Sequence, residues 1–227
     1  MILKKKNCKI ATILPYKESY SIESASAASL WVAEFFKNSN YKQNNFIYGN
    51  TESKKYLTKN YVNIYLKNLK IRFKSTTKEY SEKLVKEIIK KKFDIVEIHN
   101  RPLILSELMK NIDSKFVLYF HNDPLSMSGS RLISERETIL KNVEKLIFVS
   151  KWVKERYFIG LDTKLSYKAQ IIYPSVNKQK YIKKTKIITY VGKLNHAKGY
   201  DIYKDAITDI LNKFPKWKAV SIGDENR

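Results

Sequence analysis

Apolar and polar residues alternate along the chain in short blocks that predict a succession of strands and helices. The first block, residues 9–14, is rich in β-branched residues and is followed by Pro15, as expected of a buried strand. Residues 24–38 then place alanines and large apolar side chains at helical spacing, with serines available as caps. The chain therefore opens with a strand, a loop and a helix.

Further along, the alternation becomes regular. Two weaker strands are expected at 45–48 and 61–65, followed by helix 77–92, strand 94–99, helix 102–110, strand 115–121, helix 132–142, strand 145–149, helix 151–158 and strand 169–172. Continuous apolar strands that alternate with helices are typical of a doubly wound, Rossmann-like parallel sheet in an α/β protein. Ligands bind at the carboxyl ends of such strands, which makes the polar residues there candidates for a site.

The apolar pattern stops at Pro174, and a lysine-rich stretch follows. We interpret residues 1–175 as one domain, 176–185 as a linker and 186–227 as the first segment of a second α/β domain. That segment contains only strand 186–191, helix 200–214 and strand 217–222. So short a segment leaves strand edges open and cannot close a core, so we expect the second domain to be incomplete as given.

Composition supports a folded core and excludes several classes of protein. The 227 residues are 43% hydrophobic and 13% aromatic, which is enough for a core. Neither a membrane-spanning apolar run nor a secretory leader pattern is evident in the sequence. Cys8 is the single cysteine, and histidines and cysteines do not cluster with metal-ligand spacing. We therefore expect a cytoplasmic protein with no metal and no cofactor.

The net charge of +22 predicts an anionic partner. Nucleic acid, an anionic membrane surface and a phosphorylated small molecule compete for this role. Lysines occur in runs along the whole chain, at 4–6, 90–92 and 178–186, without a helix-turn-helix, zinc-finger or RNP motif, so we expect no specific nucleic acid. A general bias toward Lys, Asn, Ile and Tyr accounts for part of the excess charge.

The most informative candidate site lies at the start of the second domain. Lys193 follows a predicted strand, and Lys198 precedes Gly199 at a predicted helix start. The carboxyl end of a strand and the N-terminus of a helix both favour an anion, so the two ammonium groups could bind a phosphate there. The alternative is a pair of solvated lysines. Dinucleotide-binding and P-loop glycine motifs are missing from the sequence.

The segments, in this order, resemble the family-4-type glycosyltransferases, whose GT-B fold consists of two facing Rossmann-like domains. The resemblance rests on IVEIHNRP, LYFHNDP, LIFVSKWVKERY, IIYPSVN and YVGKLNHAKG. It implies transfer of a sugar, hexosyltransferase-like and with retention, from a nucleotide-sugar donor to a glycan or lipid-linked acceptor. Synthesis of cell-surface glycan or lipopolysaccharide is the implied setting, with an acceptor-side first domain and a donor-binding second domain.

The resemblance also assigns roles to residues. Gly192, Lys193, Lys198 and Gly199 would bind the donor diphosphate. His121, at a strand end, would be the catalytic residue that faces the transferred sugar and hydrogen-bonds a hydroxyl. The alternative for His121 is a packed histidine bonded to backbone.

Four residues are predicted to contact acceptor or sugar. Asn122 and Asp123 could do so, or could form a turn with the proline that follows. Glu23 and Ser24 could bind hydroxyls, or could only start the helix. His99 ends a strand at a position that in the family more often supports the cleft, so we expect a structural role for it.

The chain departs from the family pattern in three places. Loop 20–28 has no glycine where a Gly-Gly pair is usual, and YPSVN at 173–177 stands where the family commonly has Pro-Asn-Gly-Val-Asp. The family's two glutamates, eight positions apart, are not found before Arg227. A non-catalytic glycan-binding or partner-binding module therefore stays open, as does a less favoured basic nucleic-acid-binding protein. As a hypothesis, the basic first domain also rests on an anionic membrane, at its inner face.

Overall fold

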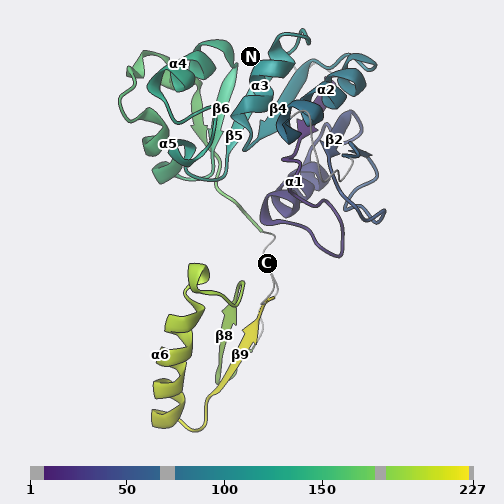
Figure 1. The fold of residues 1–227 in the computed structure, drawn as a ribbon. Helices are drawn as coiled ribbons and strands as arrows, with labels where there is room; N and C mark the ends of the chain where they lie inside the picture. The colour runs from purple at the N-terminus through teal and green to yellow at the C-terminus, as the bar shows by residue number, and fades with distance from the viewer. Residues whose placement is uncertain (1–7, 67–74, 177–182, 225–227) are drawn as a thin grey trace. The chain divides into compact units, whose positions relative to one another are not determined.

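The computed structural model describes residues 8–66, 75–176 and 183–224, and the chain divides into two compact units, Met1–Val176 and Asn177–Arg227 (Figure 1). We call them unit 1 and unit 2 and describe each by itself. The lysine run at 4–6, most of the predicted linker and most of the run at 178–186 lie outside the described residues.

Strands and helices alternate through unit 1. They are β1 (Ile10–Ile13), α1 (Ala27–Asn38), β2 (Asn45–Gly49), β3 (Tyr61–Asn63), α2 (Thr76–Ile89), β4 (Ile95–His99), α3 (Pro102–Met109), β5 (Lys115–Phe120), α4 (Ile133–Asn142), β6 (Lys145–Phe148), α5 (Lys151–Phe158) and β7 (Ala169–Ile171). Short 3₁₀ turns at Pro124–Ser126 and Thr163–Lys168 were not predicted.

Each predicted element of unit 1 forms, with small differences at the ends. The helix predicted to start at residue 24 begins instead at Ala27, because the Ser26 hydroxyl accepts a hydrogen bond from the Ser29 N–H at 3.1 Å and caps the first turn. In the same way Ser75 caps α2 and Ser150 caps α5. The side chains that end the loops therefore set where these helices begin.

The seven strands of unit 1 form one parallel sheet in the order β3-β2-β1-β4-β5-β6-β7. From β1 the chain adds β2 and β3 on one side, and it then adds β4 to β7 on the other side. The sheet is therefore doubly wound, as predicted. All carboxyl ends lie at one edge of the sheet, and ligands of such folds bind outside that edge near the reversal. The pairing of His99 with Tyr119 sets the relative position of β4 and β5 at this edge.

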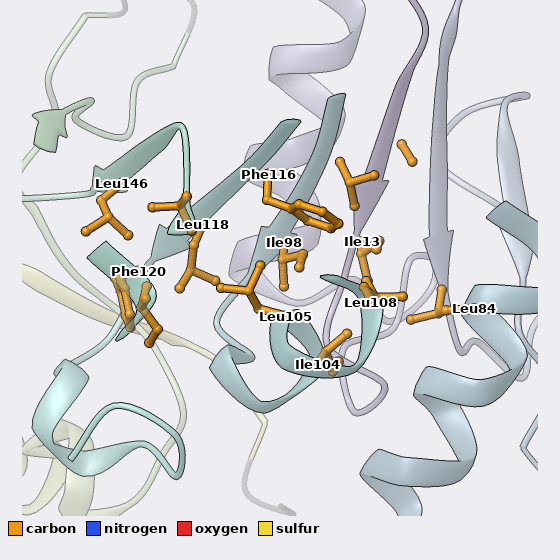
Figure 2. Packing of buried hydrophobic residues seen from close by; sticks show 14 of the residues in the cluster. Ile13, Leu84, Ile98, Ile104, Leu105, Leu108, Phe116, Leu118, Phe120 and Leu146 are labelled. Carbon is orange, nitrogen blue, oxygen red and sulfur yellow. The ribbon is translucent and has the colours of Figure 1, made fainter. Parts of the chain in front are cut away.

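Both faces of the sheet are packed. On one face, Ile13 and Ile98 from the strands meet Leu84 of α2 and Leu108 of α3 in a continuous apolar cluster (Figure 2). On the other face, Trp31 of α1 packs in a second cluster with residues of β2, β3, β5 and β6. Unit 1 thus buries a strand-rich core between two helical layers, which gives a rigid platform for the loops at its edge.

Unit 2 contains β8 (Ile187–Val191), a 3₁₀ turn (His196–Lys198), α6 (Tyr200–Lys213) and β9 (Lys218–Ile222). The two strands are parallel and pair Ile187 with Lys218. All three predicted elements form here as well. Within residues 183–224, however, α6 has no buried residue, and apolar side chains of the strands such as Val191 and Ile222 are exposed.

Candidate functional site

Two histidines meet at the carboxyl edge of the unit 1 sheet. His99 is the last residue of β4, and His121 follows the last residue of β5. Their ring atoms His99 Nδ1 and His121 Nε2 lie 2.8 Å apart, a hydrogen-bond distance. His99 is buried, with 1% of its surface exposed, while His121 is partly exposed. The predicted catalytic histidine, His121, is therefore hydrogen-bonded to a second, more deeply buried imidazole.

Aromatic side chains enclose this pair. Trp31 of α1 packs edge-on against His121, with ring centroids 5.0 Å apart, and Tyr119 of β5 stacks on His99 at 4.4 Å. Burial lowers the pKa of His121 to about 4. Burial, and then the neighbouring His121, hold the pKa of His99 well below its usual range. Both imidazoles are therefore neutral near pH 7, so they act through hydrogen bonds and not through a positive charge.

Asn100 fixes the backbone between the two histidines. Its φ of 51° lies in the left-handed region, which asparagine tolerates better than most residues. Its Oδ1 accepts a hydrogen bond from the His121 N–H at 2.7 Å, and its own N–H donates to the Tyr119 carbonyl at 2.9 Å. No individual role was predicted for Asn100, although an asparagine directly after a buried strand is a recognisable signal for such a conformation.

Asp123 is held by an arginine. Arg156 of α5 donates from Nε to Oδ1 at 3.2 Å and from Nη2 to Oδ2 at 2.9 Å, and the Leu125 N–H also donates to Oδ1. The hydrogen bond from Arg156 lowers the pKa of this carboxyl. Asp123 caps the 3₁₀ turn that starts at Pro124, so a turn does form at this place. Asn122 is exposed beside it.

Glu23 and Ser24 lie in the loop between β1 and α1. Glu23 pairs with Lys55 at 2.9 Å and accepts from the Ser53 hydroxyl at 3.2 Å. The Ser24 hydroxyl lies 2.9 Å from that of Ser21 and 3.0 Å from that of Ser19. Neither Glu23 nor Ser24 starts the helix, and a ligand that uses them would have to share these partners.

A cavity of about 510 Å³ opens at the carboxyl ends of β1, β2 and β3. Tyr16 and Tyr56 provide aromatic rings, and amides and lysines provide polar groups. Its described lining is Tyr16, Lys17, Asn50, Thr51, Glu52, Lys54, Tyr56, Asn63, Tyr65, Leu66 and Thr76. The sequence pattern does not predict this cavity, because its lining comes from separate segments of the chain.

In unit 2, Lys193 and Lys198 lie in one folded loop between β8 and α6. The Tyr190 hydroxyl lies 3.0 Å from the Lys193 carbonyl oxygen and 3.1 Å from that of Lys198. Both lysine side chains are exposed. His196 Nδ1 and Asp201 Oδ2 lie 2.7 Å apart, so the start of α6 already has a carboxylate next to it. The loop brings two ammonium groups to a strand end and a helix start.

Glycines allow this loop to form. Gly199, between the 3₁₀ turn and α6, has φ 69° and ψ 27°, a left-handed conformation that glycine adopts without strain. Gly223 follows β9, and a Cβ atom there would overlap the Gly192 carbonyl oxygen. The Gly192 N–H donates to the Ile222 carbonyl at 3.0 Å. Close contact of the two strand ends therefore requires glycine.

Apart from Glu23 and Ser24, which lie in the loop between β1 and α1, the predicted residues form two groups. His121, Asn122 and Asp123 lie together in unit 1, and Gly192, Lys193, Lys198 and Gly199 lie together in unit 2. Over the described part of the chain, acidic, histidine and cysteine side chains form no group of three that could hold a metal ion. No described helix has the length and apolar content to cross a membrane.

Comparison with curated proteins finds two relatives, one of which is named a putative glycosyltransferase. A putative glycosyltransferase, YtcC of Bacillus subtilis, is 30% identical over 156 residues, which cover 60% of this chain and 38% of YtcC. Spore coat protein SA of the same organism is 25% identical over 167 residues, covering 64% of this chain and 44% of that protein. The chain spans less than half the length of either relative. No family model matches it.

Solved structures show that the fold is of the GT-B type. HepE of Anabaena, in complex with UDP and glucose, matches with a TM-score of 0.66 and 15% identity, over 96% of this chain and 61% of HepE. Sucrose-phosphate synthase from Thermosynechococcus elongatus matches with a TM-score of 0.63 and 14% identity, over 97% of this chain and 64% of the synthase. A UDP-N-acetylglucosamine 2-epimerase also matches, at 0.53 and 11%, over 94% of this chain and 63% of the epimerase.

Proposed function

We propose that this protein transfers a sugar from a nucleotide-sugar donor to a hydroxyl acceptor. Its fold is of the GT-B type, and one of its sequence relatives is named a putative glycosyltransferase. Unit 1 would hold the acceptor and the catalytic His121. Unit 2 would begin the donor site with Lys193 and Lys198. The observation that carries this proposal is the folded loop of unit 2, where both lysines follow a strand end and adjoin a helix start.

The charges of unit 2 suit a departing diphosphate. As the bond between sugar and diphosphate breaks, negative charge grows on the phosphate oxygens. Two exposed ammonium groups beside the N-terminus of α6 would stabilise that charge, as would backbone N–H groups at the helix start. HepE was solved with UDP-glucose, a donor of this class, which supports the choice of a nucleotide sugar.

His121 would act on the sugar as a neutral hydrogen-bonding group. Its lowered pKa keeps it uncharged, and its position at the edge of the sheet is where ligands of this fold bind. The acceptor would enter the cavity at the ends of β1 to β3, where aromatic rings can stack on a sugar and amides can bind its hydroxyls.

Nucleotide binding tests the donor half of this proposal. Calorimetric titration with UDP is expected to show binding that weakens about tenfold in each of Lys193→Ala and Lys198→Ala, the loss expected for one charged hydrogen bond. Lys213→Ala, at the other end of α6, is the matched control and should bind as the wild type does. Equal affinity in all four proteins would contradict the assignment of the two lysines.

A membrane partner remains part of the proposal, because the charge of +22 suits an anionic surface that carries a lipid-linked acceptor. Lysines 90–92 follow α2, where Lys90 pairs with Glu87 and Lys91 lies over the Phe46 ring. Charge reversal at 4–6 and 90–92 should weaken sedimentation with vesicles that contain phosphatidylserine. Unaltered binding would count against a membrane role.

A non-catalytic glycan-binding module is the second candidate. It is favoured by the similarity to a protein named for the spore coat. Such a module would bind an acceptor glycan without any turnover of donor.

A further inference from the structure

Arg101 lies at the carboxyl edge of the unit 1 sheet, between the two parts of the proposed site. It follows β4 by two residues, and in the sheet β4 lies between β1 and β5. The cavity proposed for the acceptor opens at the ends of β1 to β3, and His121 follows β5. Arg101 therefore lies between the acceptor cavity and the predicted catalytic histidine.

The backbone on either side fixes this arginine in place. Asn100 has a φ of 51° and turns the chain at the end of β4, and Pro102 begins α3. Arg101 is the N-cap residue of that helix, but its side chain makes no capping hydrogen bond. The positive end of a helix also disfavours a cation. Neither capping nor the helix dipole therefore explains an arginine at this position.

The guanidinium of Arg101 packs on an aromatic ring that borders the cavity. Its Cζ atom lies 5.5 Å from the centroid of the Tyr16 ring, within the range of a cation–π contact. Tyr16 belongs to the cavity lining and packs edge-on against Tyr80, with ring centroids 5.8 Å apart. The guanidinium is therefore held against a residue of the cavity wall.

Most of the hydrogen-bonding capacity of this guanidinium is unused. Nη1 donates to the Asn100 carbonyl at 3.1 Å, and this is the one hydrogen bond that the guanidinium makes to a described residue. Nε is buried without a partner among those residues. Nη2 has no such partner either, but unlike Nε it is not buried. Because a guanidinium has five N–H donors, Arg101 retains donors for a ligand.

Arg101 also lacks an acidic partner. Within the described part of the chain it forms no ion pair, whereas Arg156 of α5 pairs with an aspartate at 2.9 Å. The described lining of the adjoining cavity contains two lysines, Lys17 and Lys54, and one acid, Glu52. Positive charge therefore exceeds negative charge beside Arg101, which favours a ligand that carries an anion.

We propose that Arg101 binds an anionic group, a carboxylate or a phosphate, on the acceptor sugar. This inference rests on the function proposed above and narrows the class of acceptor. Two oxygens of a carboxylate or phosphate match the planar fork of a guanidinium, and such charged hydrogen bonds are about twice as strong as neutral ones. The acceptor would lie in the cavity with its anionic group toward the end of β4. A neutral acceptor would leave Arg101 without a counter-charge.

Sugar binding to the full chain tests this proposal. Ligand-observed NMR titrations compare glucose, glucuronate and glucose 6-phosphate, which share a sugar ring and differ in charge. In the wild type, the better of the two anionic sugars should bind about tenfold more tightly than glucose, as expected for a charged hydrogen bond. The preferred anion distinguishes a carboxylate from a phosphate. Equal affinity for the three sugars, or no binding of either anionic sugar, would overturn the proposal.

Two arginine variants assign that preference to a residue. Arg101→Met removes the charge and should bind the three sugars alike. Arg131→Met removes the same charge from an exposed position of unit 1 and is the matched control, so it should keep the preference. Equal losses in the two variants would overturn the proposal, because they would indicate a general attraction of anions to a protein of net charge +22.

Inorganic phosphate and a second variant complete the test. Inorganic phosphate should bind the wild type more weakly than the preferred anionic sugar does, and equal binding would mean that the site does not recognise the sugar. If Arg101→Met fails to fold, Arg101→Lys decides. Lysine keeps a positive charge but offers no planar fork, so affinity for the preferred anionic sugar should fall about threefold, with glucose unaffected. An equal loss for glucose would overturn the proposal.

A UDP titration separates this inference from the proposed function. Arg101→Met should bind UDP as the wild type does, because Arg101 would contact the acceptor and not the diphosphate. A fall in UDP affinity in this variant would overturn the assignment of Arg101 to the acceptor. Absence of UDP binding in the wild type would contradict the proposed transfer but would leave the preference for an anionic sugar intact.

Discussion

Units 1 and 2 are built from the same strand and helix pattern, yet they bury very different fractions of their apolar side chains. In unit 1 a seven-stranded sheet is covered on both faces, and Phe120 is completely buried. In unit 2 two strands pair with each other and Phe214, just after α6, is 55% exposed. The comparison shows that an amphipathic pattern specifies an element, whereas burial depends on the neighbours that the element finds.

The two groups of proposed site residues are therefore held in place by different numbers of packed neighbours. His121 directly follows the buried end of β5 and is held by Asn100, Trp31 and His99. The loop with Lys193 and Lys198 is held within unit 2 by backbone hydrogen bonds and by the Tyr190 hydroxyl. We therefore expect substitutions in unit 1 to affect stability most, and those in the unit 2 loop to affect binding.

The largest expected effect compares one substitution in both units. Phe120→Ala removes a ring that stacks on Phe148 and contacts Tyr157, and should lower the free energy of unfolding by about 3–5 kcal/mol. Phe214→Ala in unit 2 should cost less than about 1 kcal/mol, because the ring is already largely exposed. Urea unfolding followed by circular dichroism measures both free energies of unfolding. Equal losses in the two variants would contradict the claim that unit 1 buries its apolar side chains more fully than unit 2.

A buried arginine is expected to have the next largest effect. Arg136 of α4 is 2% exposed and donates to the carbonyls of Tyr157 and Ile159 at 3.0 Å each. Arg136→Met leaves these buried acceptors without donors and should cost about 2–4 kcal/mol. Arg131→Met, at an exposed position, is the control and should cost little. If urea unfolding gave similar losses of free energy for the two variants, the hydrogen bonds from Arg136 to the end of α5 would contribute nothing to stability.

A smaller effect should depend on pH. Burial raises the pKa of Glu97, so the carboxyl loses its proton more readily in the unfolded chain than in the folded one. Stability from this group is therefore complete below the unfolded pKa and is lost as pH rises through the folded pKa. Glu97→Gln removes the loss, so its advantage over the wild type should grow as pH rises from 4 to 8, in urea midpoints measured at each pH. A constant difference between the two proteins would contradict this account.

The most localised effect should come from a glycine of unit 2. Gly199→Ala forces a side chain into a left-handed conformation and should cost about 1–2 kcal/mol, confined to the loop with the two lysines. UDP affinity should fall, while the unfolding of unit 1 should keep its midpoint. A lower midpoint for unit 1 would mean that the units are more strongly coupled than this account assumes.

The sequence predicted most of the fold because its strands are continuous apolar runs and its helices have one apolar face. The residues of the candidate site were harder to predict from the sequence than the fold was. The strand and helix pattern alone predicted an anion site at Lys193 and Lys198, and the resemblance predicted the role of His121, since a short motif carries it. The hydrogen bond between His99 and His121 was not predicted, because it depends on how β4 and β5 pair across the sheet.

Other contacts were missed for related reasons. Asp123 and Arg156 are 33 positions apart, so no local pattern signals their ion pair. Asn100 adopts a left-handed conformation that its position after a strand suggests but does not require. The helix start at Ala27 was placed three residues early, because several serines in that loop could each have served as the cap.

The most direct test of the central claim measures binding and turnover in the same two variants. With a labelled panel of nucleotide sugars and a glycan acceptor, His121→Ala should lose about 100-fold or more in turnover and still bind UDP, as expected when a group that acts on the transition state is removed. Lys198→Ala should lose both turnover and UDP affinity. A His121→Ala protein that transfers sugar at the wild-type rate would contradict the account.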